Sequence, residues 1–217
     1  MVRLAGTLLT LVVFAGAAVA QTALVKVSGE VVVVDGVNLE LKSSEGQLAI
    51  RLADQARMSV RSPADLDAIR EGAFLGTTAT PQPDGTLRAS EVHVFAESMR
   101  GTGEGHRPIA NEPGHTMTNA TVANVDGRKQ RDARVDATVV SVDNIPAEHE
   151  LRVTLRYKGG EQVVIVPDDV PVVMTEPGDR AMLVPGTHIV AYLAQQLDGS
   201  LLAERVTIGK DGYAPLQ

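Results

Sequence analysis

Hydrophobic and polar residues alternate along two long stretches of the chain, and this pattern predicts β-strands in both. Side chains with a period of two line one face of a strand. In the first stretch the alternating segments are followed or separated by turn-forming pairs such as Asp35-Gly36 and Glu45-Gly46. These segments are residues 25–33, 37–41, 48–52, 74–79 and 87–95. We therefore expect five strands in the first stretch.

The second stretch repeats the first. Three pairs of segments align by eye: residues 29–36 with 137–144, 72–79 with 186–193, and 84–94 with 198–208. The offset grows from 143 − 35 = 108 to 198 − 84 = 114, which predicts a six-residue insertion near residues 145–150 of the second copy. An internal repeat of this kind indicates one structural unit present twice.

Two features interrupt the alternation in both copies. Ser62-Pro63-Ala64-Asp65 has the residue types of a helix start, and Gly72 those of a helix end, so we expect a short helix between the third and fourth strands. A weaker helical turn is expected after Thr175. In the last strand of each copy the apolar phase slips after Ala89 and after Ala203, which predicts a β-bulge in each.

The element order is strand, strand, strand, helix, strand, strand, and it occurs twice. This order predicts an all-β protein built from two tandem five-stranded OB-like barrels, each with a short helix between strands 3 and 4. We expect the first unit at residues 22–97, a glycine-rich connector at 98–133, the second unit at 134–210 and a tail at 211–217. Two open meanders or small sandwiches are the alternative arrangement.

The N-terminal residues have the pattern of a secretory signal peptide. Arg3 precedes an almost entirely apolar run from residue 8 to 20, which ends in Ala18-Val19-Ala20, an A-x-A cleavage pattern. We expect residues 1–20 to be removed and the protein to be periplasmic or secreted. No later stretch of the sequence is apolar enough for a membrane span, so we do not expect an integral membrane protein.

Composition narrows the choice of partner. The chain has no cysteine, 3% aromatic residues and a formal net charge of −7. Binding of nucleic acid depends on Lys and Arg side chains that neutralise phosphates, and on stacked aromatic rings. We therefore expect no nucleic-acid partner.

The connector contains the residues best suited to chemistry. His106, His115, Met117 and Glu104 lie within it, and imidazole, thioether and carboxylate groups are ligands for copper or zinc. Two further interpretations compete with a metal site. The run Gly101-Thr-Gly-Glu-Gly105 could hold a phosphate, but it lacks the strand-to-helix context of known phosphate loops. The third interpretation, which we prefer, is a linker packed between the barrels, in which residues 116–125 could add an edge strand to one barrel.

Enzymatic activity is not expected, and no catalytic or cofactor-binding residues are assigned. The sequence has no cysteine nucleophile and no G-x-S-x-G motif. The strand histidines are expected to be surface residues. Among them His93 stands where the second copy has Thr207, and a pH-sensitive role for it stays open.

Several segments resemble a bacterial family of exported proteins with tandem OB-like domains of unknown function. They are residues 99–108, 113–122 and 157–162, together with Val166-Pro167 and the repeated Asp-Gly-strand ending of each copy. Relatives in that family are sometimes labelled as metal-transport components. The resemblance implies a non-catalytic cell-envelope binding protein that handles a metal ion or small ligand. A structural or protein-interaction module without a small ligand is the alternative.

Overall fold

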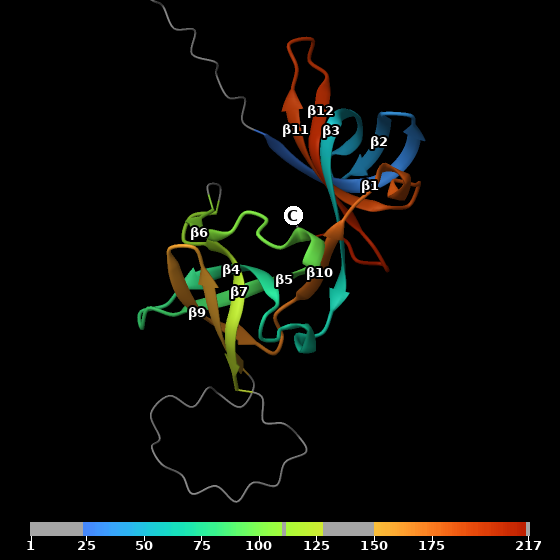
Figure 1. Cartoon of the computed structure of the whole chain (residues 1–217). Coiled ribbons are helices and arrows are strands. Elements are labelled where there is room, and N and C mark those ends of the chain that lie inside the picture. The colour runs from blue at the N-terminus through green and yellow to red at the C-terminus, as the bar shows by residue number, and fades with distance from the viewer. Residues whose placement is uncertain (1–23, 110–111, 128–149, 216–217) are drawn as a thin grey trace, which may run out of the picture.

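The computed structural model describes residues 24–109, 112–127 and 150–215 (Figure 1). Within these ranges the chain is all-β, as predicted, and contains twelve strands and three short 3₁₀ helices at Leu66–Ala68, Glu97–Met99 and Arg180–Met182. The strands are β1 (Val25–Asp35), β2 (Asn38–Ser43), β3 (Gly46–Ala64), β4 (Phe74–Pro81), β5 (Leu87–Phe95), β6 (Gly105–Pro108), β7 (Thr116–Asp126), β8 (Glu150–Tyr157), β9 (Gly160–Pro167), β10 (Val172–Pro177), β11 (His188–Gln195) and β12 (Leu201–Gly209).

Five strands pair around a closed ring, here called the first ring, in the order β1-β2-β3-β12-β11 and back to β1. Every pairing in it is antiparallel except β3 with β12. One hydrophobic cluster fills the ring, and its members include Val31, Leu41 and Leu193, each with no exposed surface. Because inward-facing apolar residues alternate with outward-facing polar ones, the period-two pattern is the sequence signal of this core.

A second ring has the same design and contains β7-β8-β9-β5-β4, with β4 pairing back to β7. Its only parallel pairing among these described strands joins β5 to β9 through Leu87–Val164 and Arg88–Ile165. A separate hydrophobic cluster fills this ring, with Leu75, Val92 and Leu155 fully buried in it.

The two rings exchange strands between the two halves of the chain. Strands β4 and β5 come from the range 22–97 but belong to the second ring, and β11 and β12 come from 134–210 but belong to the first. The observed pairing therefore crosses the two ranges expected to form self-contained units. The alternation of residues determines which face of a strand is buried. It does not determine whether β1 pairs with β4 or with the equivalent strand β11, because both present the same apolar face.

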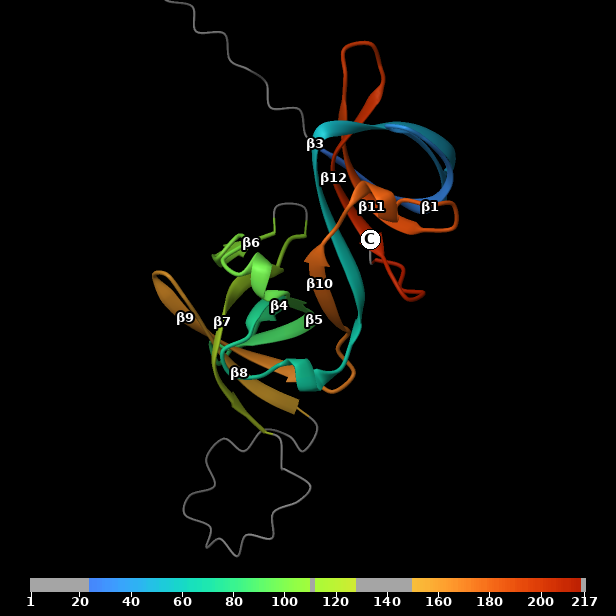
Figure 2. The same ribbon diagram turned by 45° about the vertical axis from the view of Figure 1, so that its right-hand side comes forward.

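Strands β3 and β10 join the two rings along an approximate twofold axis. Figure 2 shows both strands running between the two groups. They pair antiparallel, and Arg61 of β3 lies opposite Thr175 of β10. These two residues are separated by 175 − 61 = 114 positions, the same offset as Asp84 and Asp198 in the later strands of the repeat. The axis therefore passes between Arg61 and Thr175.

Strand β7 takes the place of the first strand in the second half. Its residues follow those of β1 at an offset of 122 − 31 = 91, and the register shifts after Val31 in β1 and after Val122 in β7. The residues 116–126 were expected to belong to the connector, yet they form a ring strand between β4 and β8. Because this strand contains polar residues such as Thr118 and Asn119, its alternation of apolar and polar positions is weak in the sequence. Residues 137–144, which the sequence aligns with 29–36, lie outside the described residues. The insertion expected near residues 145–150 does so too, apart from Glu150, which begins β8.

The short helix expected to begin at Ser62 is wrong. Ser62, Pro63 and Ala64 form the end of β3, where they pair with β10. Only the 3₁₀ helix Leu66–Ala68 follows, and the side chain of Asp65 makes no capping hydrogen bond. The pairing with β10 outweighs the local helix-start signal, because secondary-structure propensity is weak beside tertiary context. The corresponding helix near Thr175 is likewise a 3₁₀ helix, and it begins only after Asp179.

The expected β-bulges are confirmed. The β4–β5 register shifts between Thr78 and Ala79, which leaves Ser90 unmatched between Ala89 and Glu91. The β11–β12 register shifts between Tyr192 and Leu193, which leaves Glu204 unmatched. Because each bulge reverses the side-chain phase of its strand, both halves of β5 and of β12 can contribute to a core.

Candidate functional site

A cleft of about 610 Å³ lies on the twofold axis, between the two rings. Volumes of this size are typical of small-molecule sites, which span about 300–1,000 Å³. Its walls come from β1, β11 and β12 of the first ring, from β4, β5 and β7 of the second, and from β3 and the β6 segment. The lining residues with the strongest chemistry are Lys26, Arg61, Glu91, His93, Arg107 and Tyr192.

Equivalent positions of the two halves face one another across this cleft. Lys26 corresponds to Met117 at the offset of 91, and Thr78 corresponds to Tyr192 at the offset of 114. His93 and Thr207 form a third such pair, and all six residues line the cleft. The backbone is thus duplicated around the cleft while the side chains differ, so the site itself is asymmetric.

Glu91 is the centre of a polar network in the cleft wall. Its Oε2 lies 3.1 Å from Nε2 of His93, and its Oε1 lies 3.8 Å from Nη1 of Arg61. The hydroxyl of Tyr213 donates to Oε1 at 3.3 Å. His93 and Glu91 are two residues apart on β5 and lie on the same face of that strand, whereas Arg61 comes from β3. The network therefore ties the second ring to the strand on the axis.

Burial governs the protonation of this network. Burial of the imidazole lowers the pKa of His93, and the positive charge of Arg61 adds to this effect, although the hydrogen bond to Glu91 opposes it. Burial raises the pKa of Glu91, but the hydrogen bond and charge of His93, the charge of Arg61 and the Tyr213 hydrogen bond together lower it below its ordinary value. At neutral pH we therefore take Glu91 as ionised and His93 as neutral, with Nε2 carrying the proton that it donates to Glu91.

Two polar atoms in the cleft wall are buried without a protein partner. They are Nε of Arg61 and Nδ1 of His93. Buried polar groups almost always have a hydrogen-bonding partner, either protein or water. One donor of Arg61 and one acceptor of His93 are therefore free to bond to a ligand or water, beside the hydrogen bonds and ion pair of Glu91.

The residues expected to hold a metal ion occupy both faces of the β6–β7 ribbon. His106 pairs with Thr118 in the ladder, and its Nδ1 lies 2.9 Å from the Thr118 hydroxyl. The backbone amide of Ile109 donates to the carbonyl of His115, which continues the same register. Since side chains alternate along a strand, His115 and Met117 lie on the face opposite His106. The structure therefore does not bring the two histidines to one face.

Glu104, the fourth expected ligand, has a different role. Its Oε1 accepts a hydrogen bond of 2.9 Å from the backbone amide of Lys158, in the turn between β8 and β9. Across residues 24–109, 112–127 and 150–215, no three His, Cys, Asp or Glu side chains gather as a group that could bind a metal ion.

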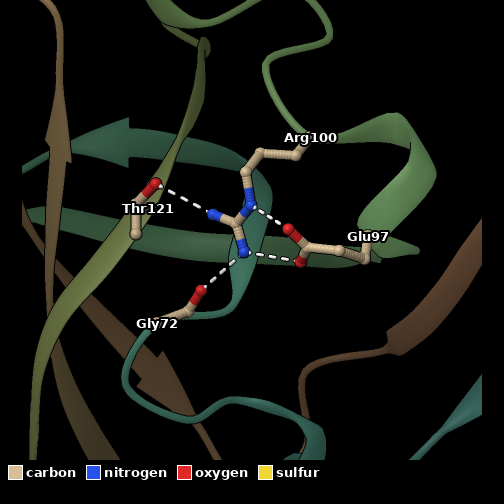
Figure 3. Close-up of polar contacts among 4 residues, drawn as sticks. All are labelled: Gly72, Glu97, Arg100 and Thr121. Carbon is tan, nitrogen blue, oxygen red and sulfur yellow. Dashed lines mark hydrogen bonds and ion pairs between the residues drawn. The ribbon is translucent and has the colours of Figure 1, made fainter.

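A second hollow, of about 420 Å³, is lined by the Phe74–Phe95 ring pair and by Arg100. Figure 3 shows the polar contacts of Arg100. The Arg100 guanidinium donates to both carboxylate oxygens of Glu97, to the carbonyl of Gly72 and to the hydroxyl of Thr121. These bonds fasten the 3₁₀ helix Glu97–Met99 to the turn before β4 and to β7. Because four of the five guanidinium N–H groups are engaged, we assign Arg100 a structural role.

The cleft residues were largely missed by reasoning from the sequence. His93 was expected at the surface, but it is only 4% exposed, so that expectation is wrong. The available signal was the difference between the repeats: Glu91 and His93 stand where the second copy has Arg205 and Thr207. No difference between the repeats pointed to Lys26 and Arg61, because their positions in the cleft depend on how β1 and β3 pair with other strands.

No family model, curated protein or solved structure matches the chain. Of the helical segments in the described part of the chain, none has the length and apolar character needed to span a bilayer.

Proposed function

We propose that this chain is a non-catalytic, exported cell-envelope protein that binds a small ligand in the cleft on its twofold axis. The observation that carries the proposal is the cleft itself, which combines a ligand-sized volume with buried polar atoms that lack a partner. Concave sites with a few converging polar groups are the usual form of small-molecule sites. Export is proposed from the signal-peptide pattern of residues 1–20, which lie outside the described residues.

We also propose that each ring is an OB-like barrel assembled from both halves of the chain. In each ring the strand order follows the 1-2-3-5-4 pattern, with strands 1 to 3 from one half and strands 4 and 5 from the other. The parallel contact of strand 3 with strand 5 closes both rings. This assembly supports the proposed binding site because it places the two rings on either side of the β3–β10 pair, where the cleft lies between them.

A cleft-filling substitution tests the proposed site. Thr78→Trp inserts an indole into the cleft, whereas Thr80→Trp makes the same change two residues further along β4, at an exposed position outside the lining. Thermal shift measurements would screen the mature protein against sugars, amino acids, carboxylates, phosphates and metal ions. We expect at least one compound to stabilise the wild type and Thr80→Trp, and to have no effect on Thr78→Trp.

Two results would contradict the proposal. One is the absence of any stabilising compound in the panel. The other is a compound that stabilises Thr78→Trp as strongly as the wild type, because its site then lies elsewhere.

A protein-interaction module is a second candidate, favoured by exposed valines on β1. Val32, Val33 and Val34 are 38%, 42% and 37% exposed, in a strand whose other side packs in the first ring. Exposed apolar groups of this kind suit a protein contact. The matched variant Val32→Thr/Val34→Thr should then lose association with solubilised envelope proteins, while ligand binding by the cleft stays unchanged.

A further inference from the structure

The cleft contains more positive than negative charge, although the whole chain has a formal net charge of −7. Three cationic residues line it: Lys26, Arg61 and Arg107. Two carboxylates line it as well, those of Glu91 and Glu112. With His93 neutral, the lining carries a surplus of one positive charge. A concave site of one sign attracts ligands of the opposite sign from solution.

The carboxylate of Glu91 is already engaged. Arg61, His93 and Tyr213 surround it, so Arg61 and Glu91 largely neutralise each other. Glu112 lies at an exposed position, as Lys26 and Arg107 do, and it forms no ion pair with either of these cations. The two carboxylates therefore leave the remaining cations of the cleft without compensation.

Lys26 and Arg107 are these remaining cations. Among the described residues, no carboxylate lies within ion-pair distance of either side chain. The guanidinium of Arg107 donates one hydrogen bond through Nη1, at 2.8 Å, to the carbonyl of Gly103. Within the part of the chain that the structure describes, its other donors have no protein acceptor. Arg205 adds a third positive group next to the cleft, because its guanidinium lies 5.0 Å from the ring centre of Tyr192, which lines the cleft.

The two uncompensated cations come from different elements. Lys26 projects from β1, opposite Tyr192 of β11 in the first ring. Arg107 comes from β6, which pairs with β7 of the second ring. A ligand with negative charge at two places, one facing each ring, would pair with both cations.

From this arrangement we infer that the cleft binds a small dianionic compound whose charged groups are carboxylates or phosphates. Lys26 contacts one charged group as a point charge, and Arg107 contacts the other through its planar fork of donors. Tyr192 provides an aromatic wall for the body of the ligand. This inference rests on the proposed function, since it names the ligand class of the same cleft.

Isothermal titration calorimetry on the mature protein tests the inference. The probes are succinate, glutarate and citrate as carboxylates, inorganic phosphate and pyrophosphate as phosphates, and succinamide as a neutral analogue of succinate. We expect a carboxylate or a phosphate probe to bind and succinamide not to bind. Comparison of the two probe groups distinguishes the carboxylate source from the phosphate source.

Charge-removing variants identify the residues. Lys26→Gln and Arg107→Gln should each weaken binding about tenfold or more, because a hydrogen bond to a charged group contributes about 1.5–3 kcal/mol. Lys42→Gln is the matched control, since it removes the same charge from an exposed position of β2 outside the cleft. Circular dichroism of each variant confirms that the fold is retained.

Three results would overturn the inference: succinamide binding as tightly as succinate, equal affinity in Lys26→Gln, Arg107→Gln and Lys42→Gln, or no heat with any anion. These results are distinguishable from failure of the proposed function. A neutral compound whose binding is abolished by Thr78→Trp would retain the cleft as a binding site and overturn only its preference for anions.

Discussion

The two halves of the molecule share a backbone design but differ in chemistry where they meet. Arg61 faces Thr175 across the axis, and the equivalents of Glu91 and His93 are Arg205 and Thr207. The strand registers and both bulge positions are nevertheless kept. The two rings therefore share their strand registers and bulges, whereas equivalent residues of the two halves differ in the cleft.

The same contrast occurs further from the axis. Phe74 and Phe95 pack together at 5.5 Å between ring centres, and Arg100 closes that corner. In the other half His188 and Gly209 occupy the equivalent positions, so neither the aromatic pair nor the clamp is present there. Within the described residues, the Arg100 contacts to Gly72 and Thr121 are thus a feature of one side of the molecule.

The largest expected effect concerns the shared core. Leu75 and Ile189 are equivalent positions, 0% and 1% exposed, in the second and first ring respectively. Leu75→Ala and Ile189→Ala should each lower the free energy of unfolding by about 2–5 kcal/mol, because each leaves a cavity. Since both rings contain strands from both halves, we expect one urea unfolding transition that shifts as a whole in each variant. Two transitions, with only one shifted by each substitution, would show that the rings are independent.

A smaller effect is expected from the His93–Thr207 difference. Because the pKa of His93 in the folded protein lies below its ordinary value of 6.5, the unfolded chain takes up a proton first as the pH falls. His93 should therefore contribute stability above pH 6.5 that is lost as the pH falls through 6.5 toward the lower folded-state pKa. Urea titrations between pH 8 and pH 5 should show a flatter pH dependence for His93→Gln than for the wild type.

His188→Gln is the control for this measurement, since His188 is exposed on β11. It should keep the pH dependence of the wild type. An unchanged slope in His93→Gln would mean that burial does not control the protonation of this imidazole.

The sequence was sufficient for the all-β class, for the positions of most strands and for both bulges, because each of these depends on the local alternation of residues. The exchange of strands could not be predicted, since β4 and β11 present equivalent faces to β1 and β7. Residues 116–125 were expected at most as an edge strand, because Thr118 stands among the apolar residues of the buried face of β7. The expected metal site rested on closeness in sequence, and the β6–β7 register separated His106 from His115.

The cleft forms only because the two rings exchange strands, so its lining residues could not be predicted from the sequence alone. Lys26 and Arg107 are 107 − 26 = 81 positions apart and carry no motif. They line one cleft because β1 pairs with β11, and β6 with β7, on the two sides of the axis.

Paired cysteines test the exchange of strands directly, because the chain has no cysteine of its own. Glu30 of β1 lies opposite His188 of β11, whereas a self-contained first half would place it opposite Phe74, the equivalent of His188. Directly opposite residues in antiparallel strands lie about 4.5–5.5 Å apart between Cα atoms, within the range for a disulfide.

Both double variants, Glu30→Cys/His188→Cys and Glu30→Cys/Phe74→Cys, would be oxidised at low concentration, and the monomer fraction would be analysed by peptide mass spectrometry. We predict an intramolecular disulfide between positions 30 and 188 and none between positions 30 and 74. A disulfide between positions 30 and 74, with none between 30 and 188, would show that each half closes on itself and would contradict the account.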